Sequence, residues 1–100
     1  MSMRTTSLRR RQHVLMRLRQ RVDPRRCRWV NLCRAVEMSL VVHKGLNDRR
    51  SLAWITYRNR QVYVVWDSID EEIVTVLGED YAAVLAWQDE MKAGVVSAAG

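Results

Sequence analysis

The chain has 100 residues, enough for one domain with a modest core, and its 48% hydrophobic and 28% charged content is typical of a folded protein. No apolar run approaches the roughly 18 residues of a membrane span, and no apolar stretch follows the arginine-rich start as in a secretory signal. We therefore expect a cytoplasmic protein without a membrane partner. The only cysteines are Cys27 and Cys33, and histidines are few, so we expect no metal site and no cofactor.

The charge is divided unevenly along the chain. Residues 1–34 contain eleven arginines, no lysine and one acid, a net charge of +10, whereas residues 35–100 carry −4. Arginine in place of lysine favours planar, bidentate contacts with phosphate or carboxylate groups. The division has two interpretations: an external surface for phosphate or an acidic protein, or complementarity between the two halves of the protein.

Hydrophobic spacing predicts helices at both ends of the chain. A helix is expected over 8–22, where Val14 and Leu18 recur on one side. Asp23-Pro24 is typical of a second helix start, with Asp as the N-cap and Pro at the first helical position. The expected elements are, in order, a polar arm over 1–6, helices over 8–22 and 24–37, strands over 39–44, 51–58, 61–67 and 72–77, a helix over 80–93 and a tail over 94–100.

This order predicts an α+β fold: two N-terminal helices, a four-stranded antiparallel meander and a C-terminal helix in a single domain, 1–100. The arm over 1–6 and the tail over 94–100 are expected to be flexible. The strands are joined by short turns, among them Asn59-Arg60. We expect the helices to cover one face of the sheet.

The most specific candidate for chemistry is His13, on the polar side of the first helix. Arg17 lies four residues later, and Arg9 and Arg10 share that side. Neighbouring cations disfavour the protonated imidazole, so a neutral His13 can act as a general base beside a phosphate. The alternative is that His13 is one more solvated polar residue on a basic helix.

The order of elements resembles the small RelE/barnase/colicin-type ribonuclease superfamily. The match covers about residues 8–77. The segments that carry it are His13, Arg17 and Arg21 on one helix, the turn Val22-Asp23-Pro24, the hairpin from Tyr57 to Val65, and the last strand, Ile73 to Leu77. The resemblance implies His13 as the acid/base, Arg17 with Arg58 or Arg60 as phosphate ligands, and Thr75 near the cleaved bond.

The leading hypothesis is a basic RNA-binding protein, in its finer form a metal-independent, toxin-like endoribonuclease. The expected catalytic residues are His13, Arg17 and Thr75, and the expected nucleic-acid-binding residues are Arg9, Arg10, Arg21, Arg58 and Arg60. The expected partner is a nucleic acid, RNA ahead of DNA, or an acidic protein such as a cognate inhibitor. The alternatives are a non-enzymatic, phage-type inhibitor or accessory protein, and a subunit of a larger assembly. The oligomeric state is left open.

Overall fold

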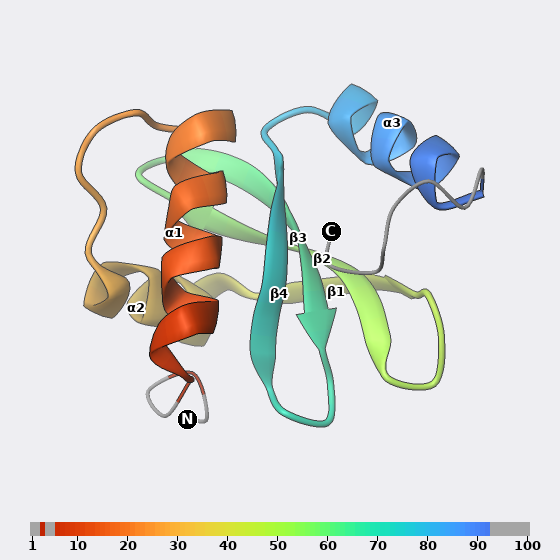
Figure 1. Ribbon diagram of the computed structural model, residues 1–100, viewed down its shortest axis with the longest axis horizontal. Helices are drawn as coiled ribbons and strands as arrows, with labels where there is room; N and C mark the ends of the chain where they lie inside the picture. The colour runs from red at the N-terminus through yellow and green to blue at the C-terminus, as the bar shows by residue number, and fades with distance from the viewer. Residues whose placement is uncertain (1–2, 4–5, 93–100) are drawn as a thin grey trace.

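The computed structural model describes Met3 and residues 6–92, and it confirms the α+β fold with the expected order of elements. All strand pairs are antiparallel, and the sheet has the meander order β1-β2-β3-β4 (Figure 1). The helices are α1 (Leu8–Arg21), α2 (Trp29–Ser39) and α3 (Tyr81–Lys92), and the strands are β1 (Val41–Gly45), β2 (Arg50–Tyr57), β3 (Arg60–Asp67) and β4 (Glu72–Gly78).

The first helix forms as the sequence predicts, whereas the second begins later. Ser7 caps α1 by accepting a hydrogen bond from the Arg10 backbone N–H at 3.3 Å. The second helix begins at Trp29, five residues after the expected start. Asp23 does not cap it, because its carboxylate accepts the backbone N–H of Arg25 in a non-helical loop. Residues 22–28 therefore form a connection between the helices.

The hairpin between β2 and β3 turns one residue earlier than expected. Arg58 and Asn59 are the two turn residues, with φ of 50° and 63°, and Tyr57 pairs with Arg60. Two consecutive positive φ values are typical of a type I′ turn, whose twist suits the flanking strands. Arg60 therefore belongs to β3, and its side chain lies on the same face of the sheet as Tyr57.

Two irregularities in β4 decide which residues of this strand face each way. Val64 pairs with Val76 and Tyr63 with Gly78, so that Leu77 is an extra residue. Between the pairs made by Val65 and Trp66, Val74 is extra in the same way. The strand therefore presents apolar side chains to both faces.

Helices cover both faces of the sheet, not one. We call the face under α1 and α2 the near face and the face under α3 the far face. Val84 of α3 packs with Leu52, Val65, Val74 and Leu77 in a separate far-face cluster. The expectation of a single covered face was wrong, because β4 has apolar residues on both sides and needs cover on each. The near-face core includes Val14, Leu18, Leu32, Val36, Ile55, Val62, Val64, Ile73 and Val76.

Most of the expected arm and all of the expected tail lie outside the described residues. Met3 and Thr6 are the two described positions of the arm, and both are buried. The backbone carbonyl of Met3 accepts a hydrogen bond from Trp29 Nε1 at 2.9 Å, and the Thr6 hydroxyl donates to Glu72 at 2.9 Å. These contacts connect the start of the chain to α2 and β4.

Candidate nucleic-acid interface

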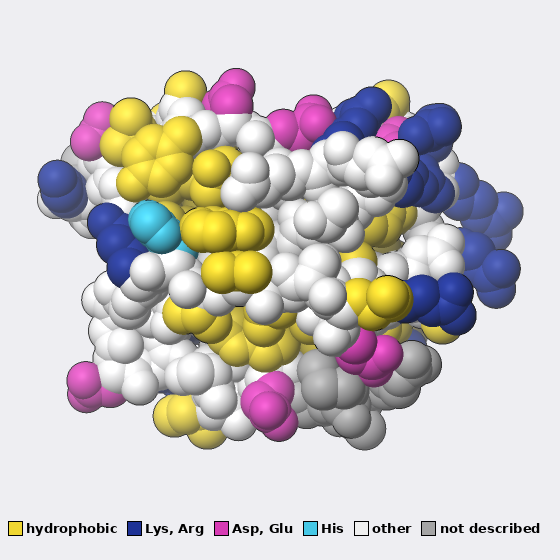
Figure 2. Space-filling view, turned by 180° about the vertical axis from the view of Figure 1, so that it is seen from behind, with side chains coloured by type: hydrophobic (Ala, Val, Ile, Leu, Met, Phe, Trp, Pro, Cys, Tyr) yellow, Lys and Arg dark blue, Asp and Glu magenta, His cyan; other side chains and the backbone are white. Residues whose placement is uncertain are grey.

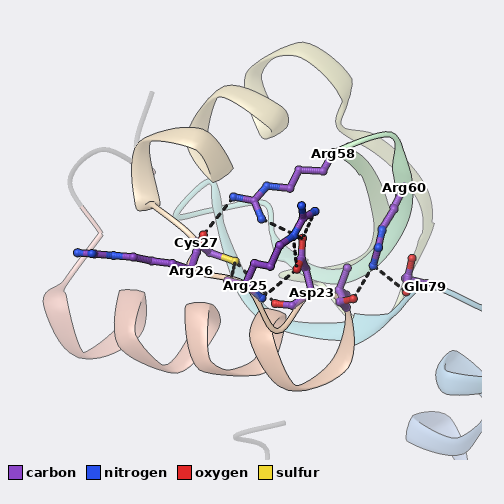
Figure 3. A network of polar contacts seen from close by, with 8 residues as sticks. Asp23, Arg25, Arg26, Cys27, Arg58, Arg60 and Glu79 are labelled. Atoms are coloured by element: carbon purple, nitrogen blue, oxygen red, sulfur yellow. Dashed lines mark hydrogen bonds and ion pairs between the residues drawn. The ribbon is translucent and has the colours of Figure 1, made fainter.

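The loop between α1 and α2 is organised around the carboxylate of Asp23, which is 1% exposed (Figure 3). Arg25 donates to it from its backbone N–H at 2.9 Å and from its guanidinium at 3.0–3.3 Å, and Arg58 Nη1 donates at 2.9 Å. The hydrogen bonds from Arg25, followed by that from Arg58, hold the pKa of Asp23 well below its ordinary value. Asp23 is therefore ionised at neutral pH.

The β2–β3 hairpin is fastened to the same loop by its two arginines. Arg58 Nη2 donates to the carbonyl of Arg26 at 3.1 Å, and Arg60 Nη1 donates to the carbonyl of Val22 at 2.7 Å. Arg60 also lies 3.5 Å from Glu79, and the Arg58 guanidinium lies over the Tyr57 ring, 5.2 Å from its centroid. Both predicted phosphate ligands of the hairpin are thus engaged within the protein.

The guanidinium groups of three further arginines take no part in this network. Arg26, Arg28 and Arg34 are exposed, and none of their guanidinium groups has a partner among the described residues. Figure 3 shows the Arg26 side chain directed away from Asp23. Figure 2 shows Lys and Arg side chains gathered at the corresponding end of the molecule, on the right of that view. We call Arg25, Arg26, Arg28, Arg34, Arg58 and Arg60 the basic end.

A shallow pocket of about 480 Å³ lies beside the basic end, between α2 and β2. Arg34 and Arg58 line it, together with the exposed amide of Asn31 and the apolar side chain of Met38. A pocket of this kind combines cations for a phosphate with an amide that can form hydrogen bonds with a base edge.

The arginines predicted on α1 serve mostly internal contacts. Arg10 lies 3.6 Å from Glu72, and Arg21 donates to the backbone carbonyl of Val76 at 2.8 Å. Burial, with a smaller contribution from Arg17, lowers the pKa of Arg21. Arg9 is exposed. The contact between Arg10 and Glu72 is one example of the expected charge complementarity between the basic residues 1–34 and the acidic residues 35–100.

The structure places the three predicted catalytic residues on two sides of the sheet. His13 is half-buried on α1, and Arg17 contacts Gln20 at 3.3 Å on the same helix. Thr75 pairs with Val65 on the far face and lines a pocket under α3, whose lining contains neither His13 nor Arg17. The sheet therefore separates the hydroxyl of Thr75 from the helix that carries the other two.

Sequence reasoning missed the role of residues 22–28. The sequence predicts a helix after Asp23-Pro24, which would distribute Arg25, Arg26 and Arg28 around its circumference. The available signal was a loop-forming dipeptide followed by a segment of almost pure arginine. The hairpin partner Arg58 was identified, but its contact with Asp23 spans 35 positions and leaves no local signal.

Comparison with protein-family models, curated proteins and solved structures finds no match to this chain. The resemblance to the ribonuclease superfamily therefore stays a prediction. Across Met3 and residues 6–92, no three His, Cys, Asp or Glu side chains gather as metal ligands. No helix in the same part of the chain has both the length and the apolar character needed to cross a membrane.

Proposed function

We propose that the protein binds RNA through the basic end. The observation that carries this proposal is the exposure of Arg26, Arg28 and Arg34, on the loop that Asp23 organises and on the helix that follows it. Cations without an internal partner on one end of a small domain are what binding to a phosphate backbone requires.

The network around Asp23 supports binding by making the loop rigid before RNA arrives. Its carboxylate holds Arg25 and Arg58 in place and offsets one of their two positive charges, whereas the charges of the outward arginines are not offset by this network. A loop that is already ordered loses less conformational entropy when it binds. Arg25 and Arg58 thus act as supports for the loop, and the outward arginines act as phosphate contacts.

The pocket beside α2 favours a single-stranded RNA over duplex DNA as the ligand. A flexible strand can place a phosphate on Arg34 and turn its base toward Asn31 and Met38 in the same pocket. Bases in a duplex are stacked and paired, so that they reach such a pocket only after unpairing.

The endoribonuclease hypothesis has less support than RNA binding. Its three catalytic residues lie on two sides of the sheet, so that a shared reaction centre has no geometric basis. The direct test is the integrity of RNA after incubation with the wild type and with His13→Ala. We expect intact RNA in both samples, and cleavage by the wild type that His13→Ala abolishes would restore the catalytic hypothesis.

The binding test uses a fluorescently labelled single-stranded RNA and measures anisotropy as protein is added. We expect saturable binding that weakens with salt, and weaker competition by duplex DNA than by unlabelled RNA. Competition by poly-glutamate that exceeds competition by RNA at equal charge would contradict the proposal and favour an acidic protein partner.

A further inference from the structure

A second pocket lies on the far face, apart from the basic end. It is bounded by the turn between β1 and β2, by β3 and β4, and by the C-terminal half of α3, and its volume is about 410 Å³. This volume is in the range of pockets that hold small molecules.

A buried hydroxyl in the lining of this pocket has no hydrogen-bond partner among the described residues. The side chain of Thr75 belongs to a residue that is 1% exposed, and its Oγ1 has no hydrogen bond with any of the residues that the structure describes. Trp87 belongs to the lining of the same pocket, and its Nε1 is likewise buried without a partner in the described part of the chain. A buried hydroxyl without a hydrogen bond is costly, and native proteins leave few of them. A ligand atom that bonds to Thr75 would recover this cost.

The pocket also combines an apolar wall with a cationic opening. Leu46, Val65, Trp87 and Met91 supply apolar surface. The lining contains Lys44, Arg50 and Lys92 but no Asp or Glu, and both lysines are exposed, in contrast to Thr75. The cationic side chains therefore favour a ligand that carries a negative charge, and the apolar residues favour a ligand whose remaining surface is apolar.

We propose that this pocket binds a small aromatic carboxylate with a hydroxyl group opposite the carboxylate. The carboxylate lies at the opening beside Lys44 and Lys92, and the ring lies against Trp87. The ligand hydroxyl reaches Thr75, where it can both donate and accept a hydrogen bond. This site is independent of RNA binding, because it lies under α3 and shares no residue with the basic end.

The test titrates the full-length protein with para-hydroxyphenylpropionate and follows backbone and indole N–H signals by NMR. We expect saturable shifts at the pocket residues, including the Trp87 indole. Phenylpropionate, which lacks the hydroxyl, should bind about fivefold more weakly, the usual worth of one hydrogen bond. Para-hydroxyphenylpropanol, which lacks the charge, should bind about threefold more weakly.

The decisive variant is Thr75→Val, which keeps the shape of the side chain and removes the hydroxyl. We expect it to weaken para-hydroxyphenylpropionate binding about fivefold and to leave phenylpropionate binding unchanged. The control is Thr56→Val, the same change at an exposed position of β2 outside this pocket. It should leave both affinities as in the wild type.

The proposal is overturned if para-hydroxyphenylpropionate produces no saturable shifts at the pocket residues, or if Thr75→Val weakens both ligands equally. Thr75→Val is expected to fold, because the hydroxyl that it removes forms no hydrogen bond with the described residues. If it does not fold, Thr75→Ser keeps the hydroxyl and should still discriminate between the two ligands about fivefold. Equal affinities of the wild type for the two ligands would also overturn the proposal.

Discussion

The double variant Arg26→Gln/Arg28→Gln tests which charges meet RNA. Both guanidinium groups are exposed and have no partner in the part of the chain that the structure describes, so their removal should change the free energy of unfolding by less than about half a kcal/mol. Each phosphate contact with a single strand contributes about 0.7 to the slope of log affinity against log salt, so losing two should flatten the slope by about 1.4. Between about 50 and 200 mM salt, the variant should therefore lose about sevenfold less affinity than the wild type.

The assay is fluorescence anisotropy with one labelled RNA at several salt concentrations. The matched control is Arg9→Gln/Lys92→Gln, which removes the same net charge from α1 and α3. We expect the control to keep the wild-type slope. If both double variants flatten the slope equally, binding depends on net charge and not on the basic end, and the reasoning is refuted.

The other predictions concern stability. Because hydrogen bonds from Arg25 lower the pKa of Asp23, the ionised carboxylate stabilises the fold at pH values above its ordinary pKa, and this stabilisation is lost as the pH falls. In denaturant titrations at pH 7, Asp23→Asn should therefore be less stable than the wild type. The difference in unfolding free energy should shrink in acid. Leu18→Ala should cost about 3 kcal/mol of unfolding free energy, since Leu18 is fully buried, whereas Leu8→Ala on the same helix, where Leu8 is 69% exposed, should cost less than about half a kcal/mol. Burial raises the pKa of Tyr57 to about 12, so an ultraviolet titration should show one late-ionising tyrosine that Tyr57→Phe removes.

Most of the fold was predictable because its signals are local. The alternation of residues in β2 and β3, the cap at Ser7 and the short turns each act within a few positions. These signals also determine the meander, because short turns leave adjacent strands no other partner. The start of α2 and the covering of the far face depend instead on contacts between distant segments.

The fourth strand shows why the sequence alone does not predict which residues of β4 face each side of the sheet. Ile73, Val74, Val76 and Leu77 are all apolar, so their pattern does not reveal which side is buried. The extra residues at Val74 and Leu77 place side chains on both faces, and α3 covers the second one. Register irregularities of this kind depend on the partner strand and are absent from the strand's own sequence.

The sequence indicated that arginines would form the candidate site, but it did not indicate which of them remain available on the surface. An arginine-rich first third of the chain indicated a phosphate surface, and Arg58 was among the expected ligands. Which arginines remain available is decided by internal partners: Arg10 contacts Glu72, Arg21 contacts a β4 carbonyl, and Arg58 contacts Asp23. Arg26 and Arg28 on the loop and Arg34 on α2 can be identified as the exposed arginines only when these internal contacts are known.

The most direct test of the account is an NMR titration of arginine side-chain Nε–Hε signals with single-stranded RNA. The account predicts that the signals of Arg26, Arg28 and Arg34 shift first and saturate together, while those of Arg9 and Arg19 on α1 move little. Shifts confined to the α1 arginines, with the basic end unchanged, would contradict it.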